Sequence, residues 1–151
     1  MLRPTASACP SCQTLGLMKT IAKALALPIL AAIAFLGYAY GSLYFAGYLF
    51  PRVVPRPYVE MLSAAAVGSL VAGLLVALPL IKMFPSRHWL AAVLVSSPFM
   101  VIRANDLAHY TGKDEQRILV MSLSEIVIYP TLIVAVCWLF NRLYPRLKNE
   151  A

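Results

Sequence analysis

Residues 61–81 read MLSAAAVGSLVAGLLVALPLI, a run without a charged side chain that decides the fold of this chain. An α-helix rises about 1.5 Å per residue and the hydrocarbon core of a bilayer is about 30 Å thick, so about 20 apolar residues make one membrane span. Two other stretches are long enough. Residues 24–51 carry no charge, and residues 118–141 carry only Glu125. The sequence therefore predicts an all-α, polytopic transmembrane helical bundle.

Composition supports this class of protein. The chain is 61% hydrophobic and 13% charged, whereas soluble domains carry roughly 25% charged residues. Its net charge of +7 comes from Lys and Arg residues placed singly or in pairs at the ends of apolar runs. Such residues reach toward lipid headgroups, and no basic stripe or arm is present of the kind that binds nucleic acid. The lipid bilayer is thus an expected partner and nucleic acid is not.

The number of spans depends on residues 89–102, a charge-free stretch that covers only about 21 Å by helical rise. We expect four spans, the third of them short, in helices at about 24–50, 60–83, 87–104 and 115–144. The alternative is three spans, with the short segment entering the membrane and returning. Either arrangement places more Lys and Arg residues inside than outside when the N-terminus is cytoplasmic, so the positive-inside rule leaves the side of the C-terminus open.

The N-terminal region differs from the rest. Residues 1–17 are rich in Pro, Ser, Thr and Cys, and we expect a flexible tail there; a translation start at Met18 is a second possibility. Lys19 and Lys23 then precede a long apolar run, which is typical of an uncleaved signal anchor. We expect residues 18–151 to form one transmembrane domain in a bacterial inner membrane, with a cytoplasmic N-terminus.

Small residues recur at helical spacing in the first two spans. In lipid, helices associate through close packing, so small residues indicate a surface where backbones approach. The first span is expected to pack on the second within one chain; a homodimer or a foreign membrane protein is the alternative. The candidate packing residues are Gly37, Gly41, Ala65, Ser69, Gly73 and Ala77.

Three tyrosines, Tyr40, Tyr44 and Tyr48, also follow one another at four-residue spacing in the first span. Tyrosines near the end of a span commonly anchor it at the membrane interface. The alternative is that their rings line a path for a ligand.

Glu125 is the candidate for an intramembrane functional residue, because an ionisable group inside a span is costly. Ser122 and Tyr129 lie three and four residues from it and share its helical face. The carboxyl group can bind a proton, hold a cationic substrate or pair with a base. The structural alternative is a buried glutamate bonded to Ser or Tyr of a neighbour, or reaching back to Arg117.

Catalytic chemistry has no visible basis in the sequence. Asp106 and His109 lack an identified third metal ligand, and no nucleophile is placed beside a base. We therefore expect no enzyme activity, no metal and no cofactor. The predicted function is a non-enzymatic accessory, scaffold or immunity-like subunit that binds another membrane protein. The alternative is a small homo-oligomeric transporter or pore that uses Glu125.

Overall fold

The computed structural model describes residues 10–49, 58–109 and 115–149, with side chains at residue 18 and within 20–48, 58–109 and 118–143. The described residues form four helices: α1 (Pro10–Leu49), α2 (Tyr58–Met83), α3 (His88–His109) and α4 (Glu115–Asn149). Each contains a segment long and apolar enough to cross a membrane, namely Thr20–Tyr48, Tyr58–Met83, His88–His109 and Ile118–Leu143. The predicted all-α bundle with four spans is confirmed.

Each helix extends past the expected bounds at one end: α2 begins two residues early, at Tyr58, α4 ends five residues late, at Asn149, and α1 and α3 are also longer. The helix α3 continues past residue 104 to His109, so its 22 residues reach about 33 Å by helical rise. The helix α1 begins at Pro10, inside the expected tail, and proline is well tolerated in the first turn because its missing N–H has no helical partner there. Residues 1–9, with Cys9, lie outside the described residues.

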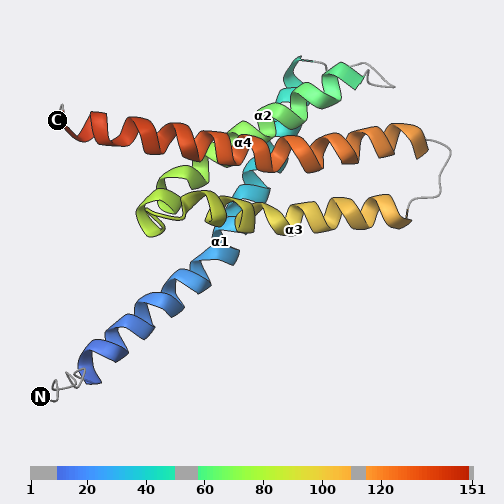
Figure 1. Cartoon of the computed structure of the whole chain (residues 1–151). Coiled ribbons are helices and arrows are strands. Elements are labelled where there is room, and N and C mark those ends of the chain that lie inside the picture. The colour runs from blue at the N-terminus through green and yellow to red at the C-terminus, as the bar shows by residue number, and fades with distance from the viewer. Residues whose placement is uncertain (1–9, 50–57, 110–114, 150–151) are drawn as a thin grey trace, which may run out of the picture.

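The helix α2 is central to the bundle (Figure 1): α1 and α4 make their most extensive contacts with it, and α3 packs mainly on α4. A tight turn joins α2 to α3, in which the Phe84 N–H donates to the Leu80 carbonyl at 2.8 Å and the Arg87 N–H to the Phe84 carbonyl at 3.2 Å. We call the end of the bundle with this turn the proximal end. The opposite end, where α1 and α3 finish and α2 and α4 begin, is the distal end.

The first small-residue contact joins α1 to α2. A Cβ atom added at Gly68 would lie 2.6 Å from the Tyr38 carbonyl oxygen, and one at Gly41 would lie 3.1 Å from the Gly68 Cα atom. A Cβ atom at Gly37 would meet the Leu75 side chain at 2.7 Å. These distances leave no room for a side chain at Gly68, so glycine allows the two backbones to touch.

A second contact joins α2 to α4, because a Cβ atom at Gly73 would lie 3.2 Å from the Val136 side chain. The small residues of α2 therefore pack against two neighbours, α1 and α4, whereas the sequence predicted packing between the first two spans. Of the six predicted packing residues, Gly41 is half-buried and the other five are buried: Gly37, Ala65, Ser69, Gly73 and Ala77.

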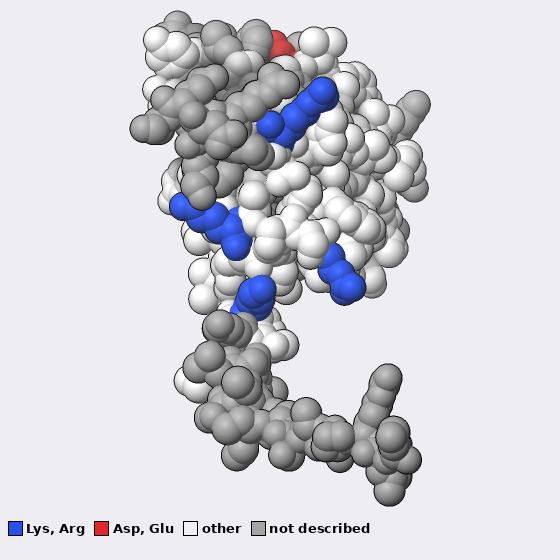
Figure 2. All heavy atoms as spheres, turned by 60° about the vertical axis from the view of Figure 1, so that its left-hand side comes forward, with Lys and Arg blue, Asp and Glu red and all other residues white. Residues whose placement is uncertain are grey.

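Charged side chains are distributed unequally between the two ends. Figure 2 shows the molecule from the side of the proximal end, where basic groups stand on a mostly uncharged surface. Exposed Lys23, Lys82, Arg87 and Arg142 lie at or near this end. The acidic side chains among the described residues, Glu60, Asp106 and Glu125, lie in the distal half.

Replacing Gly68 by alanine tests the contact between α1 and α2. Because the new Cβ atom would meet a backbone oxygen, G68A is expected to lower the free energy of unfolding by about 1–3 kcal/mol, measured by titration with sodium dodecyl sulfate in mixed micelles. G47A is the matched control, since a Cβ atom at Gly47 meets nothing within 4 Å. Equal stability of the two variants would contradict the close approach.

Candidate functional site in the distal half of the bundle

Glu125 lies two to three turns into α4 and is only 5% exposed. The Tyr38 hydroxyl on α1 donates a hydrogen bond of 2.6 Å to its Oε1 atom. Its other oxygen, Oε2, lies 2.6 Å from Nε of Arg103 on α3. Side chains from three helices therefore converge on one carboxylate.

The contact between Arg103 and Glu125 is an ion pair. Neither Nε nor Oε2 has a hydrogen-bond partner of acceptable geometry, so the N–H does not point along the short contact. The Arg103 Nη1 atom also lies 3.2 Å from Oδ2 of Asp106, and the guanidinium group lies 5.3 Å from the centre of the Phe99 ring. One cation thus faces two carboxylates, and an aromatic ring lies against it.

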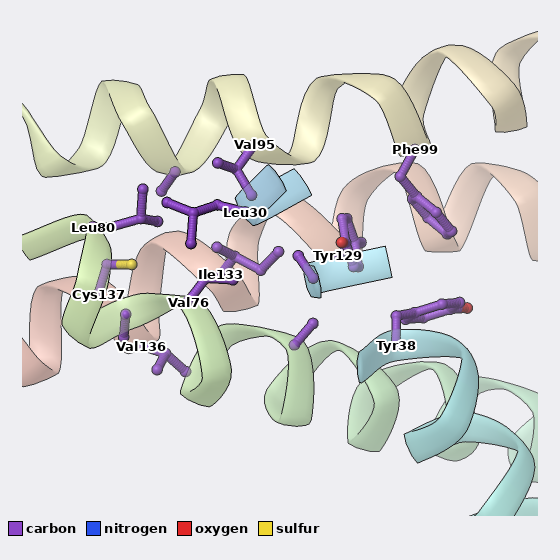
Figure 3. Packing of buried hydrophobic residues seen from close by; sticks show 14 of the residues in the cluster. Leu30, Tyr38, Val76, Leu80, Val95, Phe99, Tyr129, Ile133, Val136 and Cys137 are labelled. Atoms are coloured by element: carbon purple, nitrogen blue, oxygen red, sulfur yellow. The ribbon is translucent and has the colours of Figure 1, made fainter. Parts of the chain in front are cut away.

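An aromatic layer closes the site on its proximal side (Figure 3). The ring centre of Phe99 lies 4.3 Å from that of Tyr129 and 4.7 Å from that of Tyr38. Tyr38 and Tyr129 meet edge to face, with centres 5.3 Å apart. Beyond this layer lies the apolar core, whose fully buried members include Val76, Leu80 and Ile133. The buried Ser69 and Ser96 hydroxyls near this core bond to backbone carbonyls of their own helices, and among the described residues no buried charged side chain lies between the aromatic layer and the proximal end.

A pocket of about 440 Å³ reaches Glu125 from the distal side, between α3 and α4. Its lining combines charged, amide and hydroxyl side chains with two apolar ones, and Glu125 and Arg103 are its innermost charges. The lining residues are Arg103, Asn105, Asp106, His109, Ile118, Met121, Ser122 and Glu125. Water or a small solute can enter this pocket, and the carboxylate that it would meet is already paired.

The three polar residues predicted from the sequence lie in one region. Ser122 is 3% exposed and lines the pocket next to Glu125. Tyr129 is 1% exposed, and its hydroxyl has no hydrogen-bond partner among the described residues, although its ring packs in the aromatic layer. The structure thus gives Glu125 and Ser122 access to the pocket and places Tyr129 beneath them.

The sequence did not identify the two partners of Glu125. The helix expected at about 87–104 would end just after Arg103; it continues instead to His109, so Arg103 lies well within α3 and its guanidinium group faces the carboxylate of α4. Arg103 lies one turn after Phe99, which is a usable signal once the helix is known to continue. Tyr38 shares its helical face with Ala34 and Gly41, four residues before it and three after it, whereas Tyr40 has Leu36 and Leu43 at these positions; small residues at this spacing indicate a face turned toward another helix.

Comparison of the chain with protein-family models, with curated proteins and with solved structures gives no match. The fold and the site define a four-span α-helical membrane protein with a buried charge pair in its distal half. Among the described side chains, no group of three or more His, Cys, Asp or Glu residues is placed to hold a metal ion.

The ion pair can be tested with a double-mutant cycle. R103M leaves the buried Glu125 carboxylate without its cation and is expected to lower the free energy of unfolding by about 3–5 kcal/mol. E125M should cost less, because Arg103 is 31% exposed and still faces Asp106. The double variant R103M/E125M should recover most of this loss, because no charge then remains buried. D106N is the control and should change stability by less than about 1 kcal/mol, since Asp106 is half-exposed. Additive losses in the double variant would contradict the pair.

The two buried tyrosines provide a second, matched test. Y38F removes a hydrogen bond to a carboxylate and is expected to lower the free energy of unfolding by about 1–3 kcal/mol. Y129F removes a buried hydroxyl without a partner, so its stability should equal or exceed that of the parent protein. The same micelle titration measures the stability of both variants. A larger loss for Y129F than for Y38F would contradict the conclusion that the Tyr38 hydroxyl is bonded and the Tyr129 hydroxyl is not.

Proposed function

We propose that this protein is a non-enzymatic accessory or scaffold subunit that binds another membrane protein through the outward face of α1. This face is the observation that carries the proposal. Tyr40, Tyr44 and Tyr48 project from it with exposed fractions of 72%, 75% and 75%, and Leu43 beside them is 70% exposed. The most apolar window of the α1 span is 17% buried in the bundle, the lowest share of the four spans, against 22% for α4, 28% for α3 and 56% for α2.

The depth of Tyr40 supports a protein partner rather than lipid alone. Tyr40 lies two helical turns before Tyr48, about 12 Å by helical rise, so the three hydroxyl groups sit at successive depths. An interface anchor explains Tyr48, but a hydroxyl group deeper in hydrocarbon is unfavourable without a polar partner. Tyr44 and Tyr48 also stack nearly parallel, with ring centres 5.9 Å apart, and form an exposed aromatic pair. Aromatic surfaces of this kind are enriched in protein interfaces.

The closure of the charged site supports a role other than transport by a single copy. Glu125 is paired on both oxygens, and the aromatic layer and the apolar core separate it from the proximal end. The small residues that the sequence predicted as a packing face are largely used within the chain, for example at Gly37, Gly41 and Gly73. The α1 face is accordingly the better candidate for a partner.

A homo-oligomeric transporter or pore remains the second candidate function. The observation in its favour is the pocket of about 440 Å³ that brings the distal side to Glu125. In this case several copies would have to complete a pathway that the apolar core of one copy blocks, and Glu125 would be the proton- or cation-responsive group.

The proposed location is a bacterial inner membrane with a cytoplasmic N-terminus. The basic side chains Lys23, Lys82, Arg87 and Arg142 at the proximal end support this orientation, because Lys and Arg residues are retained on the cytoplasmic side. With four spans, the C-terminus lies on the same side as the N-terminus.

Site-specific crosslinking in the native membrane tests the proposal. A photoreactive phenylalanine analogue in place of Tyr44 is expected to join the protein to one foreign membrane protein, identified by mass spectrometry and co-purifying in stoichiometric amount. The same analogue in place of Val127, which is 64% exposed on α4, is the control and should not form that adduct. Y40L/Y44L should reduce the co-purification at least tenfold.

Adducts between copies of this chain alone would contradict the accessory function and favour the homo-oligomer. Flux through proteoliposomes with the parent protein and with E125Q would then be measured, and a loss of flux in E125Q with intact assembly would support the transporter.

A further inference from the structure

We propose that the proximal end is a binding surface for the headgroups of acidic phospholipids, formed by Lys23, Lys82, Arg87 and Arg142. The four residues come from α1, from the last turn of α2, from the turn before α3 and from α4. Sequence-distant elements thus bring four exposed cations to or near one end of the bundle, as the separate basic groups in Figure 2 indicate.

The charge of this surface is not compensated within the described part of the chain. Among the described residues, the ion pairs join Arg103 to Glu125 and to Asp106 in the distal half, and none of them involves the four proximal cations. The nearest acidic side chains among the described residues belong to the other half of the bundle. An uncompensated group of cations attracts anions, and the phosphate of a lipid headgroup is the anion available at this depth.

Aromatic rings hold two of the cations in place. The Lys23 Nζ atom lies 5.6 Å from the centre of the Phe84 ring, and the Arg142 guanidinium lies 5.5 Å from the centre of the Trp138 ring. Such contacts restrict the long side chains and keep their charges at the level of the rings. A preorganised cation loses less conformational freedom when it binds a phosphate.

The apolar surface beside the cations identifies lipid as the occupant. Both tryptophans of the chain lie in this half, Trp89 with 52% and Trp138 with 55% of its surface exposed. Exposed Leu90 and Leu139 follow them directly in sequence. A phospholipid matches both features at once, because its headgroup pairs with the cations and its acyl chains cover the indole rings and the leucines.

The tryptophans also report on binding. The protein is reconstituted into phosphatidylcholine bilayers that contain phosphatidylglycerol with brominated acyl chains, and quenching of tryptophan fluorescence gives the affinity for phosphatidylglycerol relative to phosphatidylcholine. Each basic residue near an acidic lipid surface raises affinity about fivefold. The parent protein is therefore expected to prefer phosphatidylglycerol at least fivefold in low salt, and the preference should fall toward one in 1 M salt, where screening is strong.

Variants locate the binding surface. K82Q/R87Q, which changes two exposed side chains, is expected to reduce the relative affinity at least threefold while elution from a sizing column and helical content stay unchanged; K23Q is an independent single variant with a smaller loss. R117Q, at the distal start of α4, is the matched control and should retain the parent preference. No preference in the parent protein, or an equal loss in R117Q, would overturn the proposal.

Discussion

The contact between Gly68 and the backbone of Tyr38 is the constraint on which the rest of the structure depends. Inside a bilayer no hydrophobic effect drives helices together, so their association relies on close packing of backbones. The Tyr38 carbonyl oxygen occupies the space in which Gly68 would otherwise carry a side chain. The α1 backbone is thereby held against α2 at the level from which the Tyr38 side chain reaches α4. A wider separation of α1 and α2 would take the hydroxyl away from Glu125.

The buried carboxylate in turn determines where α3 can end. Arg103 is too polar to lie in a span alone, since a single cation at this depth is strongly unfavourable. Paired with Glu125, and with Phe99 beneath its guanidinium, it can remain helical inside the bundle. The helix α3 therefore continues to His109 and attains the length of a full span. The charge pair and the full length of the third span, α3, therefore depend on each other.

The sequence predicts much of this fold because the information is local. Charge-free runs of sufficient length define three spans directly, and the intramembrane position of Glu125 follows from its own neighbours. Its partners were missed because the pairing of Glu125 with Tyr38 joins residues 87 positions apart and depends on how α1 and α4 both cross α2. Likewise, the division of the α2 small residues between α1 and α4 depends on crossing geometry, which the spacing of alanines and glycines does not determine. Arg103 was missed because a charge was taken to mark the end of a span, a rule that fails where the charge has a partner.

The exposed tyrosines of α1, unlike Glu125 and the small residues, have no role in the packing of the bundle. Glu125 was the most conspicuous residue of the sequence, yet its pairing explains its presence without any ligand. The small residues are likewise explained by contacts within the chain. The row of tyrosines on α1 is different: the bundle covers the Tyr38 side of the helix and leaves Tyr40, Tyr44 and Tyr48 outside it. Lipid satisfies the rings of these residues, but it offers no polar partner to the Tyr40 hydroxyl, which lies two turns from Tyr48 toward the middle of the α1 span. A membrane protein that packs on α1 can cover the rings and also offer a polar group to the hydroxyl. For this reason the proposed partner is a protein that binds at α1.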